Sequence, residues 1–196
     1  MTTARTAEYP IETLFLDRWS PRAYDAISIP NPDLFSILEA ARWAPSAYNV
    51  QPWRFLYAHR GDKNWATFLG LLDPFNASWA HTASALVIVI SDIIMPGDDT
   101  RPDKASHYNS FDAGAAWAQM ALQSSTMGYK AHAMAGILFD EARETLKIPE
   151  RYKIEIAVAV GKPTNPNNLP EAMRKREQPS DRKPLCELAF AGVFPS

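Results

Sequence analysis

Residues 41–55 read ARWAPSAYNVQPWRF and join the end of a predicted helix to the start of a predicted strand. The helix is expected to end at Pro45, because proline lacks a backbone N–H and disfavours helical backbone in the residue before it. Between Pro45 and Pro52 lie three polar side chains, those of Ser46, Asn49 and Gln51. A rigid loop of this kind can hydrogen-bond a flat heterocycle without contributing charge. The alternative is a connector that is held only by local Asx turns.

The helix upstream of this loop has a predicted start at Asn31-Pro32-Asp33. Asparagine caps helices well, proline suits the first helical position, and an acidic residue favours the positive end of the helix. Apolar residues then follow at the spacing i, i+3, i+4, i+7, as Leu34, Ile37, Leu38 and Ala41. This spacing predicts a helix with one buried face.

Two segments rich in β-branched residues, Ala85–Ser91 and Ile154–Gly161, predict buried strands. The other expected elements are a strand at Trp53–Ala58, helices near Lys63–Leu72, Tyr108–Met127, Glu141–Lys147 (capped by Asp140) and Glu171–Arg176, a loop at Pro96–Ser106, and an edge strand at Leu185–Phe194 lying on a neighbour. The helices between the strands differ in length and form no regular repeat. We therefore expect one domain over residues 1–196, an α+β sandwich rather than a doubly wound sheet.

Small residues form a stripe along the long helix, at Gly114, Ala118, Ala121 and Ser125. Small side chains let two helix backbones approach closely, so the stripe can mark a surface that packs against a partner helix. A stretch that merely forms a good helix explains the same residues equally well.

The composition excludes several classes of protein. The 196 residues carry a net charge of −2, without the basic excess that nucleic acid or an anionic membrane attracts. No apolar segment is long enough for a bilayer span or a signal peptide. The single Cys186 fits a reducing compartment, so a cytoplasmic location is expected.

No side-chain constellation for catalysis is visible in the sequence. The four histidines, His59, His81, His107 and His132, lack metal-ligand spacing, and no metal site is expected. Neither a glycine-rich phosphate loop nor a Gly-x-Ser-x-Gly motif occurs. We therefore expect a bound cofactor to carry the reaction.

Two basic segments are candidate anion sites. Arg18 and Arg22 lie four residues apart with Ser20 between them, and Arg182-Lys183 supplies further cations near the C-terminus. The guanidinium group is suited to bidentate recognition of phosphate. The alternative for the first segment is a solvated basic turn.

Five segments together resemble the FMN-dependent nitroreductase family. They are RWSPRAYD (18–25), ARWAPSAYNVQPWRF (41–55), DAGAAWAQMALQSSTMGYKAHAMAGI (112–137), IPERYKIEIAVAVGKP (148–163) and RKPLCELAF (182–190). They occur in the family's order and span nearly the whole chain. The resemblance implies a nitroreductase-like three-layer sandwich, with a central, mostly antiparallel sheet flanked by helices. It also implies an intertwined homodimer with FMN sites at the subunit interface.

The resemblance assigns site residues by position. The FMN phosphate and ribityl chain would be held by Arg18, Ser20 and Arg22 and by the C-terminal Arg182, with Lys183 as the neighbouring option. The loop that reaches the flavin from the other subunit would consist of Pro45, Ser46, Ala47 and Asn49, with Gln51 as a further member. The turn whose backbone faces the isoalloxazine ring would consist of Ala133, Met134, Ala135 and Gly136.

The implied activity is reduction of a nitroaromatic, quinone or similar electron-poor acceptor by NADH or NADPH, in a ping-pong hydride transfer through FMN. No side chain is expected to be catalytic. An FMN carrier or regulatory protein with little turnover is the alternative, because Ala135 stands where many members carry an acidic or polar residue. A flavin-consuming or dehalogenating member would need a lid, for which Pro96–Ser106 is the candidate. Four aromatic residues are expected in the core rather than in a pocket, namely Trp43, Tyr48, Trp79 and Phe111.

Overall fold

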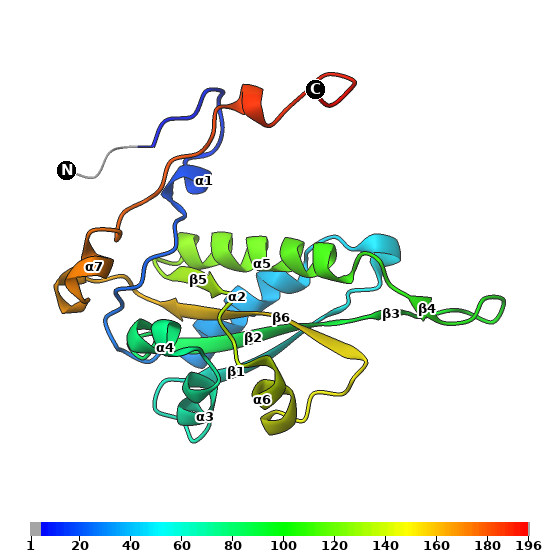
Figure 1. Cartoon of the computed structure of the whole chain (residues 1–196), viewed down its shortest axis with the longest axis horizontal. Helices are drawn as coiled ribbons and strands as arrows, with labels where there is room; N and C mark the ends of the chain where they lie inside the picture. Colours follow the sequence, from blue (N-terminus) through cyan, green and yellow to red (C-terminus); the bar gives the residue numbers. More distant parts are fainter. Residues whose placement is uncertain (1–4, 196) are drawn as a thin grey trace.

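The computed structural model describes residues 5–195, so residues 1–4 and 196 of the expected domain lie outside it. At its centre is a four-stranded sheet (Figure 1), ordered β1 (Trp53–His59), β2 (Ala85–Asp92), β6 (Tyr152–Gly161) and β5 (Lys130–Met134). Every neighbouring pair is antiparallel. All residues of β2 are buried, as expected for a strand that is covered on both faces. Three of the four predicted strands, those at 53–58, 85–91 and 154–161, are confirmed within two residues at each end.

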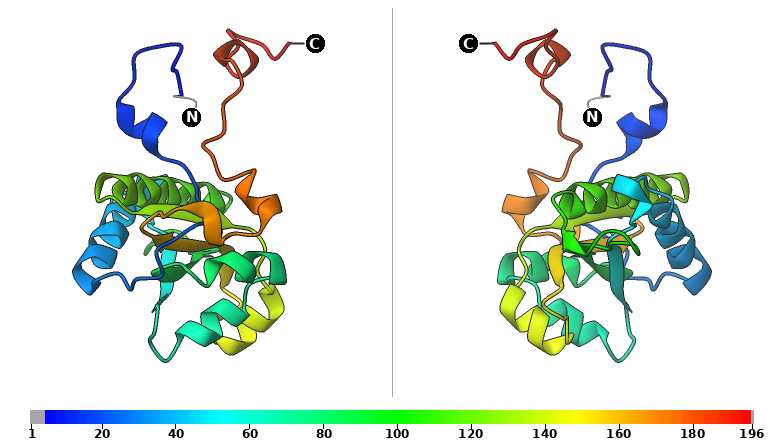
Figure 2. Two further views of the ribbon diagram at one scale, coloured as in Figure 1. Left: turned by 90° about the vertical axis from the view of Figure 1, so that its left-hand side faces the viewer. Right: turned by 90° about the vertical axis from the view of Figure 1, so that its right-hand side faces the viewer.

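Helices cover both faces of the sheet (Figure 2). One face packs against α2 (Asn31–Arg42) and α5 (Asn109–Thr126), and the other packs against α3 (Trp65–Gly70), α4 (Pro74–Ala80) and α6 (Phe139–Thr145). Side chains alternate between the two faces along each strand, so the sheet separates two cores. Val87 and Val89 contribute to the core under α2 and α5, whereas Leu86 and Ile88 contribute to the core under the other helices. The predicted α+β three-layer sandwich is confirmed.

Several local expectations need correction. Asn31 is the first residue of α2 rather than its cap, because Pro30 holds the extended cap position. Likewise Leu138 caps α6, and Asp140 lies in its first turn. Ala133 and Met134 lie on β5, paired with Val158 and Ala157 of β6, so the expected turn begins only at Ala135.

The α4 helix was not predicted, although its start carries a recognisable signal. Asp73 is the N-cap and accepts a hydrogen bond from the backbone N–H of Asn76, and Pro74 takes the first helical position. Aspartate followed by proline is typical of a helix N-terminus. The expected loop at residues 96–106 contains a short strand, β4 (Lys104–Ala105), which pairs with β3 (Ile94–Met95) to form a small hairpin.

Both terminal segments extend away from the sandwich on the side of α5 (Figures 1 and 2). The C-terminal segment contains η2 (Pro166–Asn168), α7 (Glu171–Arg174) and η3 (Leu185–Glu187). Residues 185–194 form no strand within this chain, contrary to the edge strand expected there, and Leu188, Val193 and Phe194 are exposed. Across residues 5–195, no helix combines the length and hydropathy that a bilayer crossing requires.

Candidate functional site

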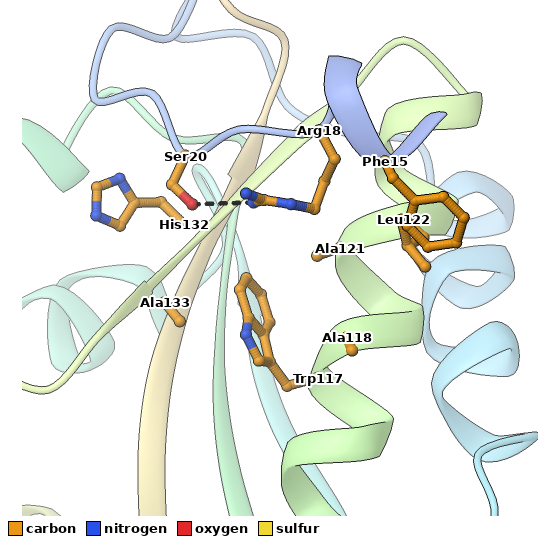
Figure 3. A pocket seen from close by; sticks show the side chains of 9 residues that line it. All are labelled: Phe15, Arg18, Ser20, Trp117, Ala118, Ala121, Leu122, His132 and Ala133. Atoms are coloured by element: carbon orange, nitrogen blue, oxygen red, sulfur yellow. Dashed lines mark hydrogen bonds between the residues drawn. The ribbon is translucent and has the colours of Figure 1, made fainter. Parts of the chain in front are cut away.

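Arg5 and Arg18 meet at the C-terminal end of α1 (Thr13–Asp17). The Nη1 atom of Arg18 donates a hydrogen bond to Ser20 Oγ at 3.3 Å (Figure 3). Arg5 donates from its Nη1 atom to the carbonyl oxygens of Leu16 and Arg18, at 3.0 and 2.8 Å. These bonds satisfy carbonyl groups at the end of α1 that have no partner within the helix. Arg5 therefore holds the backbone from which Arg18 extends.

Five arginines line one cavity of about 410 Å³, which we call the arginine pocket. Its lining consists of Arg5, Arg18, Trp19, Ser20, Arg22, His132, Arg176, Gln178, Ser180 and Arg182. No carboxylate is present among these lining residues. Burial lowers the pKa of Arg18, and the positive charges of Arg182 and Arg5 lower it further. An anion placed here would relieve this repulsion, so the pocket fits a phosphate group.

A second cavity of about 470 Å³ adjoins the arginine pocket and shares Arg18, Ser20 and His132 with it. The rest of its lining is apolar, consisting of Phe15, Trp117, Ala118, Ala121, Leu122 and Ala133. Figure 3 shows the Trp117 ring lying between α5 and Ala133 on β5. The alanines leave room beside this ring. The apolar pocket and the arginine pocket together suit a ligand with a flat apolar part and an anionic end.

His132 lies between the two pockets and was not singled out from the sequence. Its Nδ1 atom donates a hydrogen bond to the carbonyl oxygen of Pro21 at 2.8 Å, and its ring packs against Trp79 with a centroid distance of 4.7 Å. Burial lowers the pKa of His132 to about 4, with a further contribution from Arg22. The ring is therefore neutral at physiological pH, with its proton on Nδ1.

The polar loop between Pro45 and Pro52 lies elsewhere on the chain. The backbone N–H of Ala47 donates to Asp112 Oδ2 at 3.1 Å, and Asp112 belongs to the first turn of α5. The apolar pocket contacts α5 only from Trp117 onwards, roughly 8 Å further along the helix axis, and none of residues 45–51 lines either pocket. Within one chain the loop and the two pockets are therefore separate.

This loop is held in an unusual backbone conformation. Its middle forms η1 (Ala47–Asn49), and Ser46 Oγ accepts a hydrogen bond from the N–H of Gln51 at 3.0 Å. Tyr48, Asn49 and Gln51 have φ angles of 52°, 55° and 50°. Positive φ is uncommon for residues other than glycine, and such strain is concentrated at functional sites. Tyr48 is also 80% exposed, so the loop presents an aromatic ring to the outside.

The residues expected around the flavin ring occupy three different environments. Ala133 lines the apolar pocket, Met134 is buried in the core, and Ala135 is exposed at the end of β5. Gly136 accepts a hydrogen bond from the N–H of Asp73 at 3.1 Å. A Cβ atom at this position would lie 1.6 Å from Asp73 Oδ2, so glycine is needed for the turn to pack against α4.

The two C-terminal candidates are also separated. Arg182 lines the arginine pocket, whereas Lys183 lies outside that lining, with its Nζ atom 3.8 Å from Glu187 Oε2.

Of the aromatic residues expected in the core, Trp79 is fully buried, but three are exposed, namely Trp43, Tyr48 and Phe111. Among the pocket residues that sequence reasoning missed are Arg5, Trp117, His132 and Arg176. Only one feature of the sequence could have indicated Trp117, namely that it precedes Ala118, a member of the small-residue stripe.

Comparisons with known proteins agree with this architecture. A model of the nitroreductase family matches residues 16–66 and 64–162. The chain is similar to a crystal structure described as an oxidoreductase containing FMN, with 48% identity, a TM-score of 0.94, and 97% of this chain and 96% of that chain covered.

Two curated proteins are also similar to the chain. A 15.4 kDa uncharacterized protein of Mycolicibacterium smegmatis is 35% identical over 149 residues, which are 71% of this chain and 95% of that protein. A CLA biosynthesis enone reductase of Lactiplantibacillus plantarum is 25% identical over 182 residues, covering 76% of this chain and 83% of that protein. The chain belongs to the nitroreductase family of oxidoreductases.

Proposed function

We propose that the chain is an FMN-dependent oxidoreductase that uses NADH or NADPH to reduce small electron-poor acceptors. The observation that carries this proposal is the junction of the arginine pocket with the apolar pocket. FMN has the matching shape, a flat ring system joined through a ribityl chain to a phosphate. The 48%-identical protein of similar structure is described as containing FMN, which supports the same cofactor here.

The phosphate end of FMN would be held by guanidinium groups. A phosphate monoester carries a charge of about −1.5 to −2 at pH 7, and Arg18, Arg22 and Arg182 can supply charge-assisted hydrogen bonds to it. Ser20, bonded to Arg18, offers a hydroxyl at the junction where the ribityl chain would pass. Lys183 lies outside this pocket, so we assign the C-terminal contact to Arg182.

The isoalloxazine ring would lie in the apolar pocket. When bound, FMN would supply the hydride-transfer chemistry that links the nicotinamide donor to the acceptor in a ping-pong cycle. Trp117 and Ala133, which line the apolar pocket, would orient the ring. The backbone N–H of Ala135, the residue after β5, would be the candidate donor to the ring edge. No side chain is required to act as an acid or a base.

The site becomes complete only in a homodimer. Gly114 and Ala118 are exposed on α5, and small residues allow a second α5 to pack closely against them. The polar loop contacts the first turn of α5, whereas the apolar pocket contacts the helix between Trp117 and Leu122. A two-fold axis near the middle of α5 would therefore bring the loop of one subunit to the pocket of the other. Pro45, Ser46, Ala47, Asn49 and Gln51 would then reach the partner's flavin.

The C-terminal tail fits the same dimer. β1 is at the edge of the sheet, and one of its sides pairs with no strand among residues 5–195. The tail exposes Leu188, Val193 and Phe194. A tail that crosses to the partner would bury these residues and pair with an open edge. Cys186 in this segment is a free thiol, as a reducing compartment such as the cytoplasm allows.

The acceptor class follows from the chemistry of the ring site. Nitroaromatics and quinones are flat, electron-poor and uncharged, so they can stack on a flavin in an apolar pocket. The enone reductase of Lactiplantibacillus plantarum acts, by its name, on a conjugated ketone, which has the same electron-poor character. We therefore include enones among the acceptors to be tested.

Three measurements on purified protein test the proposal. The protein is expected to be yellow, or to become yellow on reconstitution with FMN, with one FMN per chain. Under anaerobic conditions NADH or NADPH is expected to bleach the flavin, and a nitroaromatic, quinone or enone is expected to restore the colour. Protein that never takes up FMN would refute the proposal. A flavin that neither donor bleaches would instead indicate a carrier or regulatory role.

A further inference from the structure

Glu177 is a buried carboxylate in the middle of the wall of the arginine pocket. Its neighbours Arg176 and Gln178 line that pocket. The Glu177 side chain is itself only 3% exposed, and it contacts the segment at residues 22–23 instead of the cavity. A buried acid costs free energy unless specific partners compensate it, so these contacts indicate what the residue does.

The partners of Glu177 are backbone groups of the opposite wall. Its Oε1 atom accepts hydrogen bonds from the N–H groups of Arg22 and Ala23, at 2.6 and 2.8 Å. Its Oε2 atom lies 3.9 Å from Arg22 Nη1 and has no hydrogen-bond partner among the described residues. The carboxylate therefore joins two segments that lie more than 150 residues apart in the sequence, and it does so at Arg22 itself.

We propose that Glu177 is a positioning residue that assembles the arginine pocket from its two walls. One wall carries Arg18 and Arg22, and the other carries Arg176 and Arg182. These like charges repel one another when no anion is bound, so the walls need a link that holds them together. Glu177 is that link, and its negative charge offsets part of the charge of Arg22. This inference rests on the proposed FMN function of the same pocket.

The experiment compares FMN with riboflavin, which lacks the phosphate. The full-length chain is stripped of flavin and titrated with each compound, and the quenching of flavin fluorescence reports binding. Glu177→Ala is expected to weaken FMN binding about tenfold or more, because two charge-assisted hydrogen bonds that hold the phosphate site are lost. Riboflavin binding is expected to change by less than about threefold, since the apolar pocket does not contain this link.

Two further variants make the result specific. Glu177→Gln keeps an oxygen that can accept both N–H groups, and it is expected to recover most of the FMN affinity. Glu171→Ala removes an exposed acid of α7 that pairs only with Lys175 among the described residues, and it is expected to leave both affinities unchanged. If Glu177→Ala does not fold, Glu177→Asp replaces it, because the shorter side chain cannot reach both N–H groups and should lose FMN selectively.

The outcomes separate this inference from the proposed function. Equal losses of FMN and riboflavin, or an unchanged FMN affinity in Glu177→Ala, would overturn the positioning role. A wild-type chain with no preference for FMN over riboflavin would overturn the assignment of the pocket itself, and the inference with it. A selective loss of FMN that the glutamine variant recovers would establish the role.

Discussion

The Nδ1 atom of His132 lies 2.8 Å from the carbonyl oxygen of Pro21. A carbonyl oxygen can only accept, so the imidazole must donate, and this fixes the proton of the neutral ring on Nδ1. The bond ties β5 to the segment that carries Arg18, Ser20 and Arg22. It therefore couples the end of the sheet to the arginine pocket.

This bond leads to a prediction about stability and pH. The pKa of His132 falls from 6.5 to about 4 in the folded chain, so between these values the unfolded chain binds the additional proton. Stability is therefore expected to fall as the pH is lowered from 6.5 towards 4, by about 2 kcal/mol at pH 5 from this group alone. Urea unfolding at pH 7.5 and pH 5 measures the loss. The side chain of His132→Gln can still donate a hydrogen bond to Pro21 but does not titrate. Between pH 7.5 and pH 5 the free energy of unfolding of this variant is therefore expected to fall by about 2 kcal/mol less than that of the wild type. Equal losses in both proteins would contradict the prediction.

The two adjacent cations at the C-terminus are expected to behave differently. Arg182→Ala removes a guanidinium that lines the arginine pocket and is expected to weaken FMN binding about tenfold or more, as for a lost charge-assisted contact. Lys183→Ala removes the same charge next to it and serves as the matched control, with a change of less than about threefold. Flavin titration followed by fluorescence measures both. Similar losses in the two variants would show that only the general positive charge matters.

Much of the fold could be predicted from local sequence patterns. The β-branched segments at 85–91 and 154–161 and the apolar spacing of Leu34, Ile37, Leu38 and Ala41 report burial directly. The structure buries the four helix residues, all of 85–91 and most of 154–161. The small strand β5 was missed because its short alternating segment of small residues resembles a turn as much as a strand. Its pairing with β6 is a tertiary contact that no local pattern encodes.

The site was predictable only in part, for a related reason. Arg18, Ser20 and Arg22 are close in the sequence and could be recognised as one group. Arg5, His132 and Arg176 reach the same pocket through contacts over long sequence distances, and each alone is an ordinary polar residue. The separation of the 45–51 loop from the pocket could be seen only in three dimensions.

The contact between Asp112 and the loop gives a further prediction. Asp112 is 2% exposed and accepts the N–H of Ala47, so Asp112→Ala leaves a donor of the strained loop without its partner. The variant is expected to be about 1–3 kcal/mol less stable and to bind FMN more weakly. Asp140→Ala removes an exposed acid from the first turn of α6 and controls for the loss of a favourable helix-dipole interaction alone. Urea unfolding and flavin titration measure the two effects. Equal stability losses in both variants would mean that the loop contact contributes nothing.

Gly114 provides the sharpest test of the proposed dimer. It is an exposed residue of α5, and a Cβ atom added there would meet no other atom within 4 Å. Gly114→Glu therefore causes no clash within one chain, but it places a charged side chain where a second α5 would pack. The variant is expected to be monomeric in light scattering, to keep its helical circular dichroism, and to lose FMN, because the partner's loop no longer reaches the pocket.

Gly70 is the matched control for this experiment. It ends α3, is exposed, and likewise leaves open space for a Cβ atom. Gly70→Glu adds the same charge to a helix on the opposite face of the sheet, so it is expected to remain dimeric and yellow. A dimer in the Gly114→Glu variant would place the subunit interface elsewhere. A monomer that still binds FMN tightly would show that one chain holds the cofactor alone, and the 45–51 loop would then need another explanation for its strained backbone.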